Sequence, residues 1–236
     1  MGDNGGHNLM EITPRLSENN GSLSEKQLVQ QTVTLLPDFL RDYELEWSFE
    51  REVGVGRAIA DVVVLLKSKR DRAAPPELLT IAESVILASL RRSGRTRIDL
   101  LEKRCGVRRE GLRDGLLDRL KRWGLVTHGR GGLVELSTTL TDQYQIIALE
   151  AKLFRWRDAL NQARSYQRYA DRSYVVLPEA VAERALKHKG EFVSNGIGLL
   201  SVSEQRLDVL LEAGQCTSHD WRREFVYSRL MASQEG

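Results

Sequence analysis

The chain has 236 residues, 41% of them hydrophobic, which excludes wholesale disorder and allows one large or two small domains. Its longest apolar run, residues 59–66, is far shorter than the roughly 20 residues of a membrane span, so we expect no membrane partner. The first residues do not resemble a secretory signal, and Cys105 and Cys216 lie too far apart to indicate a disulfide or zinc framework. We therefore expect a cytoplasmic protein.

The charges are distributed unevenly along the chain. The whole chain has 35 Lys and Arg against 33 Asp and Glu, a formal net charge of +2. Residues 70–140 alone carry 15 basic and 9 acidic side chains, a net charge of +6, which leaves −4 for the rest. A basic block in an otherwise acidic chain indicates that one part contacts nucleic acid. A solvated, arginine-rich helical surface would give the same count.

The first third of the chain predicts a helix and two strands. Residues 1–22 are rich in Gly, Asn and Ser without periodicity, which indicates a flexible tail. Ser24 can cap a helix, which we expect to end before Pro37. The following pattern predicts two strands joined by a glycine turn, at residues 46–53, Gly54 with Gly56, and 58–66.

The basic middle block predicts three helices and a hairpin after a polar linker. The expected ranges are 67–76 for the linker, 76–92, 98–104 and 109–123 for the helices, and 125–136 for the hairpin. With the tight turn at Gly106, residues 76–138 resemble the winged helix-turn-helix family. That resemblance implies DNA contacts from the third helix and the hairpin tip, through Arg108, Arg109, Arg113 and Arg130. Winged helices also mediate protein contacts, so that alternative stays open.

The last third returns to alternating strands and helices. We expect a strand, a helix, a strand, a helix and a final hairpin at 146–154, 156–170, 173–177, after Pro178, and 197–202 with 207–211. The segments 23–69 and 141–236 then form one discontinuous domain, interrupted by the insertion 70–140.

Three features of the outer segments suggest chemistry. Asp61 lies within an apolar strand, where a carboxylate is costly unless it is paired or binds a metal. Glu150 and Lys152 are two residues apart on another strand, so they share a face. Gln162 and Tyr166 are four apart on the next helix. The alternatives are a salt bridge of Asp61 with Arg57 or Lys152, an inert Glu150–Lys152 ion pair, and an apolar helix face that includes Tyr166.

Together these features resemble the PD-(D/E)XK nuclease superfamily over most of both outer segments, although Ala60 stands where the name-giving proline would be. The stretch from Gln162 to Tyr166 resembles an element of RecB-related nucleases. The resemblance implies an α/β, restriction-endonuclease-like fold: a mixed-sheet core flanked by helices, with an inserted winged-helix domain.

The resemblance also implies roles for individual residues. Asp61 and Glu150 would hold Mg²⁺ or Mn²⁺ with the Ala151 carbonyl, and Glu25 would be a further ligand. Lys152 would position the attacking water or offset charge on the phosphate. Gln162 would orient Lys152 or contact the substrate, with Tyr166 beside it.

The function that follows is a metal-dependent DNA endonuclease whose inserted winged helix binds DNA. Three arginines on the polar face of the helix after Lys152 either contact DNA phosphates or are solvated, namely Arg157, Arg164 and Arg168. The alternatives are a non-catalytic DNA-binding regulator or scaffold and an RNA-directed or protein-partnered nuclease. DNA is the expected partner, and a homodimer is left open.

Overall fold

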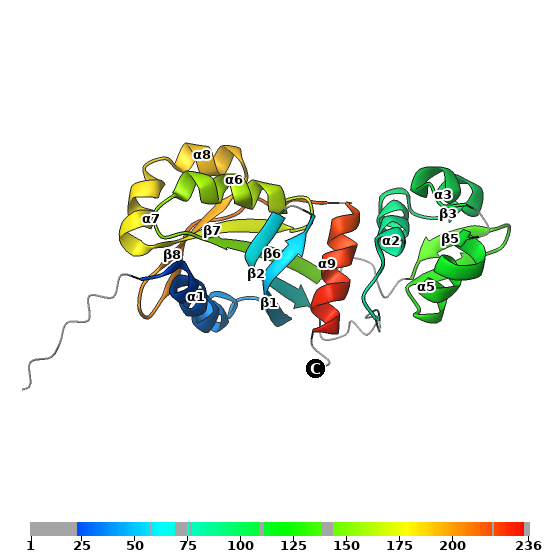
Figure 1. Cartoon of the computed structure of the whole chain (residues 1–236), viewed down its shortest axis with the longest axis horizontal. Helices are drawn as coiled ribbons and strands as arrows, with labels where there is room; N and C mark the ends of the chain where they lie inside the picture. The colour runs from blue at the N-terminus through cyan, green and yellow to red at the C-terminus, as the bar shows by residue number, and fades with distance from the viewer. Residues whose placement is uncertain are drawn as a thin grey trace, which may run out of the picture.

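A six-stranded mixed sheet forms the centre of the molecule (Figure 1). The computed structural model describes residues 23–56, 58–68, 75, 77–108, 111–137, 144–218 and 220–233, with only the backbone for residues 113 and 114. The strands, in sheet order, are β1 (Glu46–Val55), β2 (Ala58–Lys67), β6 (Tyr144–Ala151), β7 (Arg172–Pro178), β8 (Gly198–Val202) and β9 (Leu207–Leu211). The pairs β6–β7 and β7–β8 are parallel and the other pairs antiparallel, which confirms the expected mixed sheet.

Helices cover both faces of this sheet, so the α/β class is confirmed. On one face α1 (Glu25–Phe39) packs over a core that includes Leu28, Leu36 and Val64. The helices on the other face are α6 (Trp156–Tyr166), α7 (Glu179–Leu186), α8 (Lys189–Ser194) and α9 (Trp221–Ala232). Figure 1 shows α1 on the opposite side of the strands from α6 and α8.

Helix α1 continues past the proline that we expected to end it. It begins as predicted at Ser24, whose side chain accepts from the backbone N–H of Gln27 at 3.2 Å. Pro37 lies in its last turn, where a missing N–H removes a single hydrogen bond. Leu36 and Leu40 are buried on either side of it, and their burial favours the extra turn.

A smaller unit with its own core lies between β2 and β6. Its elements are α2 (Ile81–Ser93), β3 (Thr96–Arg97), α3 (Ile98–Cys105), η1 (Leu112–Leu117), α5 (Asp118–Arg122), β4 (Val126–Gly129) and β5 (Leu133–Leu136). The strands form a three-stranded sheet in the order β3-β5-β4. Helix α2 begins at Ile81 rather than at residue 76, because Thr80 and Glu83 form a reciprocal capping box.

Other boundaries also differ from expectation. Strand β6 spans residues 144–151 rather than 146–154, and α6 ends at Tyr166 rather than at residue 170. The final hairpin forms as expected from β8 and β9. The predicted tail 1–22 and Arg109 lie outside the described residues, as does the side chain of Arg113.

The smaller unit joins the sheet at one end of β2 and β6. Lys67 pairs with Tyr144 at that end, whereas Asp61 and Glu150 lie six residues further along their strands. At about 3.3 Å per residue, roughly 20 Å separates the two ends. The smaller unit is therefore distant from the carboxylates, although it leaves the same two strands.

Helix α9, which the sequence reading did not identify, connects the sheet to the smaller unit (Figure 1). Asp220 caps it, and Val226 and Leu230 pack into the core of the sheet. On its other side Glu224 is 1% exposed and pairs with Arg91 of α2, Oε1 to Nε at 2.7 Å. Arg91 and Glu224 therefore fix the smaller unit to the sheet.

Further buried polar contacts surround that ion pair. The Tyr144 hydroxyl donates to Glu224 Oε2 at 3.3 Å. Arg223 pairs with Asp171 at 3.0 Å and donates to the Tyr144 carbonyl at 3.2 Å.

In the part of the chain described here, no helix has the length and apolar character needed to cross a membrane.

Removal of Arg91 tests the importance of this connection. Arg91→Ala leaves the Glu224 carboxylate buried without its cation, and we expect a loss of about 3–5 kcal/mol in the free energy of unfolding. Urea denaturation measures it. The control Arg97→Ala breaks an exposed pair with Asp99, which solvent screens, and should have little effect on stability. Equal losses for the two variants would contradict a special role for the buried pair.

Candidate functional site

Side chains from four separate elements meet where β2 begins and β6 ends. Glu25 comes from the first turn of α1, Asp61 from β2, Glu150 from β6 and Tyr166 from the last turn of α6, with Lys152 directly after β6. All five residues were predicted from the sequence. Contacts join Glu25, Lys152, Glu150 and Tyr166 to one another, and Asp61 accepts from the backbone of Ala151, which lies between Glu150 and Lys152.

The β1–β2 hairpin is irregular beside this site. Glu52 is the one described non-glycine residue with positive φ, +53°. The pairing passes from Arg51–Val62 to Val53–Ala60 and omits Glu52 and Asp61. Ala60 and Val63 nevertheless pack into the same core, so the usual alternation of faces breaks between them. Asp61 therefore stands outside the regular ladder.

Asp61 and Glu150 differ in their contacts. Asp61 Oδ2 accepts from the backbone N–H of Ala151 at 2.8 Å, and among the described residues Asp61 forms no ion pair. Glu150 Oε1 lies 3.2 Å from Lys152 Nζ, and Glu150 Oε2 contacts the Tyr166 hydroxyl. Lys152 Nζ also lies 3.4 Å from Glu25 Oε2. Lys152 thus joins two carboxylates, and the alternative Asp61–Lys152 salt bridge is not formed.

Burial shapes the electrostatics of the site. Burial, together with the neighbouring Asp61 carboxylate, raises the pKa of Glu150 to about 7. Burial also raises the pKa of Asp61, although the Ala151 N–H and the Lys152 ammonium oppose that shift. For Lys152 burial acts downward, but the Glu150 and Asp61 carboxylates outweigh it and raise the pKa. The ammonium therefore stays charged beside two carboxyls that compete for protons.

The oxygen donors at this site are of the kind that a hard divalent cation prefers, but they are too few to complete its coordination. Because the N–H and C=O of a strand residue point to the same side, the Ala151 carbonyl faces β2, as its N–H does. Asp61, Glu150 and this carbonyl supply the oxygen ligands that Mg²⁺ and Mn²⁺ prefer. Within the described ranges no group of three or more His, Cys, Asp or Glu side chains could hold a metal ion. A cation here would need water or phosphate oxygens as further ligands.

Tyr166 lies between the carboxylates and a neighbouring cleft. Its hydroxyl is 2.7 Å from the Ile59 carbonyl as well as in contact with Glu150. Gln162 is exposed one turn earlier on α6 and lines the cleft, about 560 Å³ in volume. No described contact joins the Gln162 side chain to Lys152.

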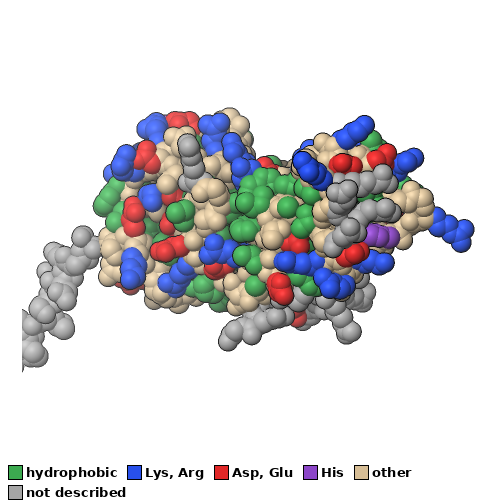
Figure 2. All heavy atoms as spheres, turned by 45° about the vertical axis from the view of Figure 1, so that its right-hand side comes forward, with side chains coloured by type: hydrophobic (Ala, Val, Ile, Leu, Met, Phe, Trp, Pro, Cys, Tyr) green, Lys and Arg blue, Asp and Glu red, His purple; other side chains and the backbone are tan. Residues whose placement is uncertain are grey.

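The arginines predicted to contact DNA are spread over both units. Arg108 is exposed after α3, and Arg130 is exposed at the tip between β4 and β5. Arg157 stacks on Trp156 and pairs with Glu191 at 3.1 Å, whereas Arg164 and Arg168 are exposed. On the face shown in Figure 2, basic side chains lie over both units, with acidic side chains among them. The positive surplus of the middle block is therefore no single continuous patch on this face.

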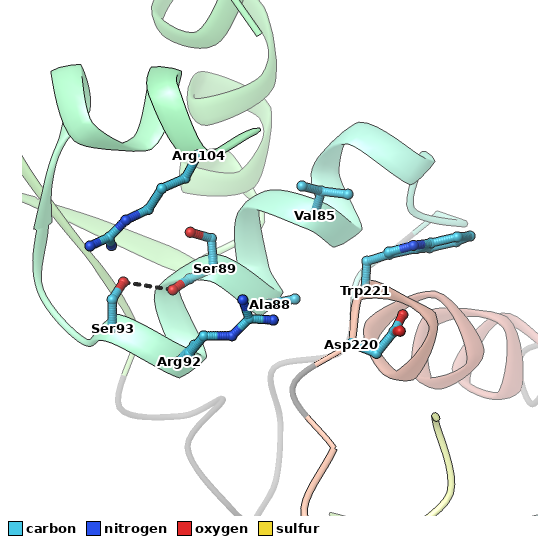
Figure 3. Close-up of a pocket in the computed structure, with 8 residues that line it drawn as sticks. All are labelled: Val85, Ala88, Ser89, Arg92, Ser93, Arg104, Asp220 and Trp221. Atoms are coloured by element: carbon cyan, nitrogen blue, oxygen red, sulfur yellow. Dashed lines mark hydrogen bonds between the residues drawn. The ribbon is translucent and has the colours of Figure 1, made fainter. Parts of the chain in front are cut away.

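A second hollow, about 500 Å³ in volume, lies between α2 and the start of α9 (Figure 3). Arg92, Arg104 and Trp221 line it, with Asp220 at its edge. Asp220 is held by Arg222 at 2.8 Å and caps α9, so its carboxylate has a structural role. None of the predicted catalytic residues lies in this hollow.

The raised pKa of Glu150 predicts a pH-dependent stability. In the folded protein the pKa of Glu150 is about 7, above its ordinary value of 4.5. Protonation of this carboxyl therefore stabilises the folded state fully below pH 4.5, and that stabilisation is lost as the pH rises through 7. From pH 5 to pH 8 in EDTA, we expect the free energy of unfolding to fall more for the native protein than for Glu150→Gln. The difference should be on the order of 3 kcal/mol. Urea titrations at each pH measure it, with exposed Glu204→Gln as control. Parallel profiles would contradict the expectation.

The comparisons with known proteins do not assign this chain to a family. No family model matches the chain, and no curated protein matches it. A solved structure described as the SPO1766 protein of unknown function from Silicibacter pomeroyi is similar over 49% of this chain and 77% of its own, with 18% sequence identity and a TM-score of 0.28. A similarity at that TM-score supports no conclusion about the fold or the function of this chain.

Proposed function

We propose that this protein is a metal-dependent DNA endonuclease of the PD-(D/E)XK type, with a winged-helix insertion that binds DNA. The observation that carries the proposal is the meeting of Asp61, Glu150 and Lys152 at the ends of adjacent strands. Glu150 paired with Lys152 at 3.2 Å, and Asp61 held by the N–H of the residue between them, match the needs of phosphodiester hydrolysis, which are a cation site and a fixed positive charge.

The order of elements supports the same proposal. Helix α1, strands β1, β2 and β6, helix α6 and strand β7 follow one another as the resemblance implies, with the smaller unit inserted after β2. In that unit α2, α3 and the consecutive segments η1 and α5, which form a third helix, precede a β-hairpin, and this is the arrangement of a winged helix.

Each residue of the site has a part in the proposed reaction. A bound Mg²⁺ or Mn²⁺ would polarise the scissile phosphate and lower the pKa of its water. The Ala151 N–H holds one oxygen of Asp61, which orients the carboxylate toward β6. Tyr166 fixes one oxygen of Glu150, while Lys152 reaches the other. Lys152 is 20% exposed, so its ammonium can also approach a phosphate oxygen or a nucleophilic water.

The distance between the candidate site and the point where the insertion leaves the sheet bears on how DNA would bind. About 20 Å of strand separates the site from the insertion, which corresponds to roughly six base pairs of B-form duplex at 3.4 Å each. Because α9 fixes the smaller unit, a duplex bound there would reach the site at a constant distance rather than through a flexible tether.

Asp61→Asn and Lys152→Ala test the catalytic assignment. Each should reduce Mg²⁺-dependent cleavage of plasmid and linear DNA by at least about 100-fold, because each removes a charge from the reacting centre. DNA binding in EDTA should change little. The control is Lys189→Ala, an exposed lysine on α8. Undiminished cutting by both variants would refute the assignment, and native protein that binds but never cuts would favour the non-catalytic regulator.

Arg108→Ala combined with Arg130→Ala tests the DNA contact of the insertion. Both side chains are exposed, so their removal should leave stability unchanged. If they contact phosphates, duplex affinity falls and the slope of log affinity against log salt decreases by up to about 2. Fluorescence anisotropy across a salt series gives both quantities. An unaltered slope would show that these two arginines do not bind phosphate.

A further inference from the structure

The hollow between α2 and the start of α9 has walls from both units of the molecule (Figure 3). Helix α2 and Arg104 of α3 form one wall, and Asp220 and Trp221 form the other. The buried pair of Arg91 with Glu224 joins α2 to α9, so a buried contact holds the two walls together. At about 500 Å³ the hollow lies within the range of small-ligand sites.

Two arginines are the hydrogen-bond donors that this hollow offers to a ligand. Arg92 lies in the last turn of α2 and Arg104 in the last turn of α3, and both side chains are exposed. The Ser93 hydroxyl donates to the Ser89 carbonyl at 2.7 Å, the contact drawn in Figure 3, so it is already used. Guanidinium groups bind phosphate oxygens with strong, charge-assisted hydrogen bonds.

Asp220, the acidic residue of the lining, already has its own counterion. Its Oδ2 lies 2.8 Å from a guanidinium nitrogen of Arg222, and its Oδ1 accepts from the Arg222 backbone N–H at 3.0 Å. Arg104, in contrast, forms no ion pair among the described residues. The charges of the lining therefore favour an anion.

The rest of the lining is apolar. Val85 and Ala88 belong to α2, and the half-buried Trp221 faces them from α9. A lone inorganic anion would leave this apolar surface uncovered. A sugar-phosphate unit matches both parts, because the C–H groups of the sugar suit the apolar surface and the phosphate suits the arginines.

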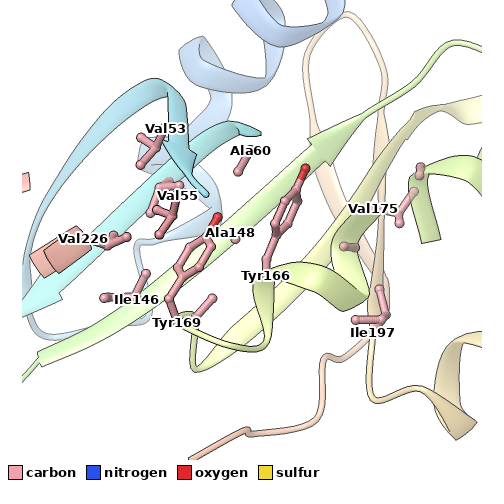
Figure 4. Close-up of a cluster of buried hydrophobic side chains, with 14 of the residues drawn as sticks. Val53, Val55, Ala60, Ile146, Ala148, Tyr166, Tyr169, Val175, Ile197 and Val226 are labelled. Carbon is pink, nitrogen blue, oxygen red and sulfur yellow. The ribbon is translucent and has the colours of Figure 1, made fainter. Parts of the chain in front are cut away.

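The hollow leads to the cleft beside the carboxylates. Asp220 and Trp221 line the hollow, and the next residue, Arg222, lines the cleft together with the exposed Arg168. Tyr166 also lines that cleft. Figure 4 shows its ring extending from α6 toward the strands, where its hydroxyl contacts Glu150. A strand that crosses the first turn of α9 therefore passes from the hollow to the carboxylates along further arginines.

We propose that the hollow between α2 and α9 binds a backbone phosphate and its sugar in the DNA strand that runs to the carboxylates. The inference rests on the proposed function. It adds a DNA-binding site formed by both units, separate from Arg108 and Arg130 of the insertion. Because its walls come from both units, it binds the strand at a defined position relative to the cut.

Paired substitutions test the proposal. Arg92→Ala with Arg104→Ala removes both arginines of the hollow. The matched control is Arg95→Ala with Arg97→Ala, which removes two exposed arginines of the same unit that do not line the hollow. Val85→Trp fills the hollow from α2 without a change in charge. Urea denaturation checks that each variant folds.

Affinities are measured in EDTA by fluorescence anisotropy for a duplex of about 20 base pairs. A series of the same duplex carries one uncharged methylphosphonate linkage, moved along one strand. We expect the native protein to lose affinity about 10-fold when the linkage occupies the position bound in the hollow. The control pair should show the same loss at the same position.

The pair Arg92→Ala with Arg104→Ala should bind the unmodified duplex about 10-fold more weakly and lose its sensitivity to the linkage at that position. Its slope of log affinity against log salt should decrease by about 1 to 2, since each phosphate contact contributes roughly 0.9. Val85→Trp should also weaken binding of the unmodified duplex.

Equal losses for the two arginine pairs would indicate a general effect of charge and would overturn the proposal. So would a hollow pair that keeps the native response to the linkage. Thymidine 3′,5′-bisphosphate, followed by Trp221 fluorescence, tests a free nucleotide as the ligand. If it binds while the hollow pair leaves the affinity for DNA unchanged, the DNA strand is the wrong occupant.

Plasmid cleavage with Mg²⁺ reports on the proposed function separately. Native protein that responds to the neutral linkage through the hollow but never cuts would keep this binding site and remove the nuclease assignment. Protein that cuts, while its hollow pair binds DNA like the native protein, would keep the nuclease assignment and remove this binding site.

Discussion

The buried ion pair between Arg91 and Glu224 determines how the two parts of the molecule are arranged. Glu224 projects from a helix that otherwise packs on the sheet, and Arg91 belongs to the first helix of the inserted unit. Both side chains are almost fully buried, so neither tolerates the loss of its partner. The insertion is therefore held against the sheet, and it leaves β2 and β6 roughly 20 Å along the strands from the carboxylates.

Much of the site could be predicted from the sequence because charged residues inside apolar strands are conspicuous. Asp61 in β2 and Glu150 in β6 stand among Val, Ile, Leu and Ala, where burial without a partner is unfavourable. The spacing of Glu150 and Lys152 placed them on one face, and the structure shows them in contact. Even Glu25, a distant residue on α1, lies beside Lys152.

Other features could not be predicted because they depend on tertiary contacts. Helix α9 does carry a helical signal, with Asp220 as its cap and apolar residues at 226, 227, 230 and 231. The sequence does not show that its charged residues Arg223 and Glu224 are buried, since their partners lie far away in the chain. The left-handed backbone of Glu52 has no sequence signal, because non-glycine residues rarely adopt it.

The insertion between β2 and β6 also affects how the chain can fold during synthesis. Strand β2 cannot pair with β6 until the whole smaller unit, from residue 68 to residue 143, has been made. That unit has a local core of its own and can fold first. The edge of β2 that later pairs with β6 stays unpaired until β6 has been made. Helix α9 follows β9 in the chain, so the contacts between the two parts form only after the strands of the sheet have been made. Until then the apolar β2 hairpin is the segment most exposed to aggregation.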